Sequence, residues 1–319
     1  MNREQNVKIF YHPEQSVNDD GNTNISKSPS KPGLLLESLK REGLTDCFTI
    51  EGNFSPFSRE DFKIAHTAAY VDGFFSGDPL YCETNGLKWT NELANSVRYT
   101  NSSLYHAIRE AVRNPSVVTL SPTSGFHHAQ PENGRSYCTF SGQVISSVMI
   151  WREFKIAGAY LDLDGHYGNS IEDSRAFIPE LNEAVPPGAN INPRGLNNEY
   201  VESFSKHLSL LKDKILDGEI GYVVFCHGAD SHEYDDFYGQ CNTSEWLKCS
   251  EMFYQWVQEI DRLRPSPLPV AISLFGGYRS DDFQSVLTLH IADLAICLNV
   301  LCGRNIAYHP AVAERAQGR

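Results

Sequence analysis

Several features that would point to export, membranes or cysteine-bound metal are missing from these 319 residues. The N-terminal stretch MNREQNVKIFYHPEQ has no apolar segment of the kind found in secretory signal peptides. We find no apolar run near the roughly 18 residues of a membrane span. None of the eight cysteines forms a C-x-x-C pair, which argues against a cysteine zinc site. We therefore expect free structural thiols and a reducing, cytoplasm-type compartment, with secretion as an effector left open.

Positive charge is also scarce. Lys and Arg number 27 against 40 Asp and Glu, which gives a net charge of −13. This balance argues against nucleic-acid binding, which depends on neutralising phosphates. It favours cationic substrates at long range, although salt screens this attraction. The same balance is common among soluble proteins, and the oligomeric state is not readable from the sequence.

The chain shows no composition shift, long linker or internal repeat. We therefore predict a single domain over residues 1–319, although two domains are possible on length alone. The polar segment NDDGNTNISKSPSKP, residues 18–32, is rich in turn formers and predicts a surface loop.

Apolar strand-like runs alternate with helix-like periodic segments along most of the chain. Strands are expected at residues 116–122, 156–164, 221–230 and 269–278, and helices at 33–42, 87–113, 141–154, 199–216, 244–263 and 282–301. Such alternation predicts right-handed β–α–β units, and therefore an α/β fold with a central parallel sheet between helical layers.

Side chains that carry chemistry follow four of these strands. They are His127 and His128, then Asp162, Asp164 and His166, then Asp230, and finally Tyr278. Because parallel sheets bind their ligands at the carboxyl ends of the strands, we expect these groups to converge at one edge. Alone, each has an ordinary interpretation as a solvated loop, a helix cap or a turn. Their joint occurrence favours a catalytic site.

Two carboxylates and one imidazole, Asp164, His166 and Asp230, form a three-ligand metal site that leaves one position open. That is the catalytic rather than the structural pattern for zinc. Asp162 lies deeper on the same strand, where it can orient a histidine or hold a monovalent cation. A carboxylate in a buried strand is costly unless it is paired or bound to a cation.

The remaining groups suit hydrolysis. His127 and His128 are candidates for acid and base chemistry near neutral pH. Tyr278 follows a glycine pair and has a hydroxyl that can stabilise a developing oxyanion. Together with a metal that polarises a carbonyl and activates water, they suit hydrolysis of an amide or ester.

Four blocks of sequence give a resemblance to a known family. They are SPTSGFHHAQPENGRSYCTFSG (residues 121–142), YLDLDGHYGNSIED (160–173), VVFCHGADSHEYDDFYG (223–239) and SLFGGY (273–278). In these blocks the chain resembles the histone deacetylase superfamily, which includes bacterial acetylpolyamine amidohydrolases. The resemblance implies the arginase/deacetylase fold, a central parallel sheet between helical layers.

The resemblance also implies roles for the residues that match. Asp164, His166 and Asp230 would ligate one zinc ion. His128 would be the general base towards the zinc-bound water, and Tyr278 would polarise the acyl carbonyl. His127 would pair with Asp162, and Asn169 would be the partner of the second histidine, His128. Tyr137, and Gly134 or its neighbours, would form the wall of the substrate tunnel, with Phe237 near its rim. A potassium ion would lie near Asp162 and Asp164.

The chain departs from the family pattern in a few places. Tyr167 stands where the family usually has a second histidine, so we expect altered packing near the metal but not loss of the metal. The block AVPPG is followed by a longer loop than usual. The resemblance therefore does not decide whether Asn190 or Ile191 forms the opposite tunnel wall. Asp236 stands where proline is common.

Three functions compete. The leading hypothesis is a zinc-dependent deacetylase that removes acetyl or a related acyl group from the ε-amine of lysine in proteins. The second is the same reaction on acetylpolyamines or another small amine, which the acidic balance and Asn169 favour. The third is a non-catalytic binding protein that keeps the fold. The ligand set excludes neither zinc nor ferrous iron. No nucleic-acid or membrane partner is expected.

Overall fold

A seven-stranded, entirely parallel sheet forms the centre of the protein, with strand order β2-β1-β3-β7-β6-β4-β5. The computed structural model describes residues 3–17 and 26–314. The strands are β1 (Val7–Phe10), β2 (Phe48–Glu51), β3 (Val118–Ser121), β4 (Gly158–Asp162), β5 (Asn190–Ile191), β6 (Tyr222–Gly228) and β7 (Val270–Phe275). The predicted parallel α/β sheet is confirmed.

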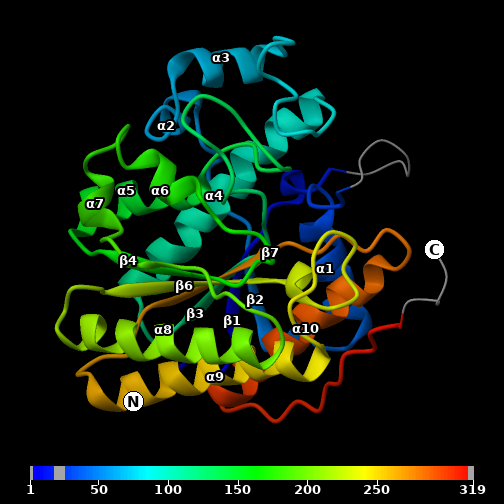
Figure 1. The fold of residues 1–319 in the computed structure, drawn as a ribbon, viewed down its shortest axis with the longest axis vertical. Coiled ribbons are helices and arrows are strands. Elements are labelled where there is room, and N and C mark those ends of the chain that lie inside the picture. The colour runs from blue at the N-terminus through cyan, green and yellow to red at the C-terminus, as the bar shows by residue number, and fades with distance from the viewer. Residues whose placement is uncertain (1–2, 18–25, 315–319) are drawn as a thin grey trace.

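Helices cover both faces of the sheet (Figure 1). On one face lie α4 (Asn91–Arg113) and α5 (Gly142–Phe154), and on the other α1 (Lys31–Arg41), α8 (Asn198–Leu216), α9 (Thr243–Leu263) and α10 (Phe283–Val300). Shorter helices are α2 (Arg59–Phe62), α3 (Ala68–Ser76), α6 (Ser170–Ser174) and α7 (Leu181–Ala184). This arrangement is a three-layer α/β fold, and each strand runs with its carboxyl end towards the same edge.

The central strands β3, β4, β6 and β7 are buried along their whole length. Because both faces are covered, these strands are buried at every position and consist mostly of apolar residues, although β3 also buries Thr119 and Ser121. In the register of the sheet, Asp162 at the end of β4 lies opposite Cys226 of β6, and Gly228 at the end of β6 lies opposite Phe275 of β7. The loops after these three strands therefore begin at nearly the same height.

One expected loop is shorter than predicted. Of the predicted loop 18–32, residues 18–25 lie outside the described residues, and Lys31 and Pro32 already form the first turn of α1. A proline in the first turn of a helix costs no hydrogen bond and presets the backbone. Lys31 is fully buried, and its Nζ donates hydrogen bonds to the carbonyl oxygens of Phe275 and Gly276.

Within the described part of the chain, one helix is long and apolar enough to cross a membrane by length and composition. It is α10, whose mean hydropathy is 1.5 although it contains His290 and Asp293. The expectation that no segment approaches this length was wrong here. The helix is 72% buried inside the protein, as a core helix would be.

The cysteines are all free thiols in the structure, as predicted from their spacing. All but Cys47 are buried. Burial in apolar surroundings raises the pKa of a thiol and makes it a small apolar side chain. The seven buried cysteines therefore belong to the core.

Candidate active site

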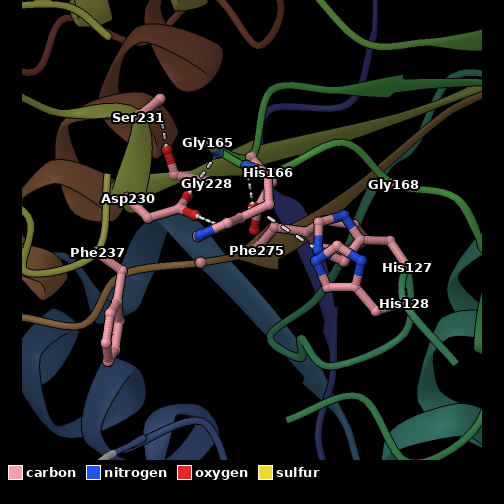
Figure 2. A network of polar contacts seen from close by, with 12 residues as sticks. His127, His128, Gly165, His166, Gly168, Gly228, Asp230, Ser231, Phe237 and Phe275 are labelled. Carbon is pink, nitrogen blue, oxygen red and sulfur yellow. Dashed lines mark hydrogen bonds and ion pairs between the residues drawn. The ribbon is translucent and has the colours of Figure 1, made fainter. Parts of the chain in front are cut away.

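Three potential metal ligands meet at the carboxyl ends of two neighbouring strands. Asp164 and His166 follow β4, and Asp230 lies in a 3-10 turn, Ala229–Ser231, that follows β6. His166 Nδ1 lies 3.1 Å from Asp164 Oδ1 and 2.9 Å from Asp230 Oδ2. Figure 2 shows His166 between Asp230 and the histidine pair His127–His128. The sequence placed these ligands at one edge, and the structure brings them together.

Glycine backbone makes room for the Asp230 carboxylate. The N–H of Gly165 donates a hydrogen bond of 3.0 Å to Asp230 Oδ1. A Cβ on Gly276 would lie only 1.9 Å from that same oxygen, and Gly276 has a φ of 28°. No other residue type fits at Gly276 without displacing the carboxylate.

The site concentrates negative charge away from water. Asp164 is 5% exposed and Asp230 is fully buried. Burial, together with the Asp164 charge, raises the pKa of Asp230 well above its usual range. Hydrogen bonds that the carboxylates of Asp164 and Asp230 accept from the imidazole raise the pKa of His166 to about 10. Two buried carboxylates that share one imidazole therefore require a compensating positive charge at this point.

A divalent cation fits this donor set. One ligand atom each from Asp164, His166 and Asp230 lies within 4.8 Å of the others. Carboxylate oxygen and imidazole nitrogen are ligands for zinc, and three protein ligands leave a position open. These residues are the ones that would hold the ion.

His127 is paired with Asp162 behind the ligand trio. Its Nδ1 lies 2.9 Å from Asp162 Oδ2, and its Nε2 lies 3.7 Å from Asp164 Oδ1. Although burial acts in the opposite direction, the charges of Asp164 and Asp162 raise the pKa of His127 to about 9. The other oxygen of Asp162 accepts the N–H of Asp164 at 3.2 Å. Both Asp162 oxygens thus have partners within the protein, and nothing here supports the expected potassium ion.

His128 differs from His127 in its hydrogen-bond partner and in the direction of its pKa shift. Its Nδ1 lies 2.8 Å from Oδ1 of Asn169, and the amide nitrogen of Asn169 donates to Asp173. Because Asp173 fixes which end of the amide faces the imidazole, His128 Nδ1 must carry the proton, and Nε2 keeps its lone pair. Burial and the nearby His127 lower the pKa of His128 to about 4. His128 is therefore neutral near pH 7.

His128 and His166 open onto a cavity of about 220 Å³. It is lined by His128, Ser136, Tyr137, His166, Phe237 and Tyr278. The Tyr278 ring centroid is 5.7 Å from that of Tyr137 and 5.2 Å from that of Phe237. Burial raises the pKa of Tyr278 well above its usual range, and Asp164 and Asp230 add to the effect. The phenol is therefore protonated and able to donate a hydrogen bond.

The cavity lining includes two of the residues expected to form the tunnel wall, Tyr137 and Phe237. For the wall expected from Gly134 or its neighbours, Ser136 lines the cavity and Gly134 does not. A two-residue turn between Arg135 and Cys138 puts both Ser136 and Tyr137 in left-handed backbone, with φ of 47° and 63°. This turn directs Tyr137 to the cavity, while Gly134 packs against the Tyr70 hydroxyl and Asn85.

Tyr167, the main departure from the family pattern, is 50% exposed. The guanidinium of Arg194 lies 5.7 Å from its ring centroid. His166 beside it keeps both contacts with the carboxylates. The substitution therefore leaves the ligand trio intact.

Sequence reasoning missed residues that act through others. Asp173 orients Asn169 from four residues away, a spacing that places both on one side of a helical turn. Asp235, which is 4% exposed, accepts the backbone N–H of Tyr278 at 2.7 Å. Lys31 reaches the same loop from 244 residues away. Spacing gave a usable signal only for Asp173, because the other contacts are long-range.

Replacing Asp230 by Asn should lower zinc affinity by at least about 100-fold, since loss of a mere supporting group already costs roughly 10–100-fold. Isothermal titration of metal-free protein with zinc measures this directly. Asp236→Asn is the matched control, because Asp236 lies in the same loop and bonds Ser280 instead. Equal zinc affinity in Asp230→Asn and Asp236→Asn would contradict the assignment.

Comparison with known proteins gave matches to one family model and to solved structures. A family model described as "Histone deacetylase domain" matches residues 26–180. Among solved structures, the chain is similar to one described as "Crystal Structure of HDA15 HD domain", with a TM-score of 0.71 and 14% identity over 93% of this chain and 90% of that chain. At this identity the likeness shows the fold. Comparison with curated proteins gave no match. Residues 26–180 are thus similar to the histone deacetylase domain, and the chain as a whole shares the fold of the matched structure.

Proposed function

We propose that this protein is a zinc-dependent deacetylase that removes acetyl or related acyl groups from the ε-amine of lysine in proteins, with residues 1–319 as one catalytic domain. The observation that carries the proposal is the cavity lining, where His166 of the ligand trio, a neutral His128 and a protonated Tyr278 face one space, with Asp164 and Asp230 buried behind His166. The match of residues 26–180 to a histone deacetylase domain supports a hydrolase.

The metal, when bound, would supply Lewis acidity, which polarises the acyl carbonyl and makes water a better nucleophile. His128 accepts the proton of the attacking water at Nε2, because Asn169 holds the proton on Nδ1. The same nitrogen then returns that proton to the departing amine. His127 stays protonated beside Asp162 and keeps His128 in its neutral, proton-accepting form.

Tyr278 stabilises the charge that develops on the acyl oxygen. Its phenol is protonated at neutral pH and lies on the cavity wall opposite Tyr137 and Phe237. A positioned hydroxyl donor acts more strongly on the transition state than on the neutral carbonyl, so it accelerates the chemical step.

The cavity walls favour an acyl-lysine. Tyr137 and Phe237 present aromatic surfaces, their ring centroids 6.4 Å apart, which suit the apolar methylene stem of a lysine. Among the residues that the structure describes, the lining contains no carboxylate that would select the second ammonium group of a polyamine. These features favour lysine in a polypeptide over a small polyamine.

Acetate release from an acetyl-lysine peptide and from an acetylpolyamine, measured side by side with zinc-loaded protein, tests the proposal. We expect preference for the peptide. Tyr278→Phe should lower kcat by about 10²–10³-fold with zinc content unchanged, the usual cost of losing one oxyanion donor. Preference for the polyamine would contradict the lysine assignment. Full activity of Tyr278→Phe, or silence of the zinc-loaded protein on both substrates, would contradict the mechanism.

Asn169→Asp should move the acid limb of the kcat/KM profile to higher pH by about one unit, since an opposite charge raises a histidine pKa. The sign follows from the role of His128, which works as a neutral base and is lost when protonated. With Asn169, its pKa is lowered to about 4, so the base is fully available at pH 7. An acid limb that stays in place or moves down would show that His128 is not the base.

A further inference from the structure

The loop that carries Tyr278 has little rigidity of its own. Two glycines precede the tyrosine, and both have positive φ, 28° at Gly276 and 106° at Gly277. Glycine pairs leave the backbone free to adopt several conformations. A hydroxyl that stabilises an oxyanion must be held within a few tenths of an ångström. Something outside the loop must therefore fix the backbone at Tyr278.

The buried carboxylate of Asp235 makes that contact. Its Oδ2 accepts the N–H of Tyr278 at 2.7 Å, and its Oδ1 accepts the N–H of Phe237 at 3.0 Å. Asp235 is 4% exposed, so both bonds are shielded from water. Charge-assisted bonds to backbone N–H groups are stronger than neutral ones. One carboxylate thus anchors the backbone of two cavity walls whose ring centroids are 5.2 Å apart.

A second buried charge holds the other side of the glycine pair. The Lys31 ammonium donates to the carbonyls of Phe275 and Gly276. The glycine pair is therefore held at one end by a cation on carbonyl oxygens and at the other by an anion on an N–H. Asp236, the next residue in the loop, bonds the N–H and hydroxyl of Ser280, which is outside the cavity lining.

We propose that Asp235 is a positioning residue that acts on the reaction through Tyr278, by fixing the backbone at that residue and its distance from Phe237. The inference rests on the proposed function, since it assigns Tyr278 a role in turnover. It predicts that Asp235 controls kcat only while the Tyr278 hydroxyl is present.

Hydrogen exchange of the zinc-loaded protein tests the anchor without any assay of activity. In Asp235→Asn, the amides of Tyr278 and Phe237 should exchange at least about tenfold faster, because one accepted bond is lost and the other weakened. Asp236→Asn is the matched control, and it should speed exchange only at the amide of Ser280. Overlapping peptides separate the Ser280 amide from that of Tyr278. Unchanged exchange at Tyr278 in Asp235→Asn would overturn the anchor.

A double-mutant cycle tests the route to catalysis. In the wild-type background, Asp235→Asn should lower kcat about tenfold, as a small misplacement of a reacting group does, while zinc content is kept. In a Tyr278→Phe background, measured by single-turnover acetate release, the same change should cost less than about twofold. Asp236→Asn should change kcat little in either. Equal losses in both backgrounds would overturn the proposal.

Two further outcomes, a variant that does not fold and a wild-type protein without activity, can be told apart from failure of the anchor. Should Asp235→Asn fail to fold, Asp235→Ser provides a smaller acceptor for the same cycle, and equal kcat losses with and without the Tyr278 hydroxyl overturn the proposal there too. No turnover by the wild-type protein on any acylated amine would defeat the proposed function and, with it, the catalytic half of this inference. The exchange experiment would still decide whether Asp235 fixes the loop.

Discussion

The burial of two carboxylates in one small space, Asp164 and Asp230, is the constraint on which the rest of the site depends. A buried carboxylate is tolerated only when it is paired or bound to a cation. Strands β4 and β6 pair in parallel, and Asp162 at the end of β4 lies opposite Cys226, two residues before the end of β6, so the loops that follow place these two side chains together. His166 joins them at hydrogen-bonding distance. Burying these two carboxylates costs free energy when no cation is bound, and a divalent ion between them offsets that cost.

The two adjacent histidines show how the surroundings assign different work to identical side chains. Asp162 and Asp164 raise the pKa of His127 to about 9, while burial and the nearby His127 lower that of His128 to about 4. Neighbouring titratable groups whose pKa values are pushed apart are typical of acid and base assignments. The neutral member faces the cavity and the charged one lies behind it. The tautomer of His128 depends in turn on Asn169 and its anchor.

Much of this was predictable from the sequence, and the exceptions have physical reasons. The four strands that carry the site and the long helices were predicted because long apolar or amphipathic periods are strong signals. Strand β5 was missed because two residues carry too little pattern, and β2 because most of it is not buried. Strand β1 was also not predicted. The Ser136 wall was missed because left-handed backbone at serine and tyrosine leaves no mark in composition. The contacts of Asp235 and Lys31 could not be predicted from sequence patterns, because they join residues far apart in the chain.

The central claim is that one divalent ion is held by two carboxylates and one imidazole. X-ray absorption at the zinc edge of the stoichiometrically loaded protein tests it most directly. The account predicts a first shell of oxygen and nitrogen only, at about 2.0–2.2 Å, with the scattering pattern of one imidazole. A sulfur neighbour at about 2.3 Å, or a shell with two or more imidazoles, would place the ion elsewhere and contradict the account.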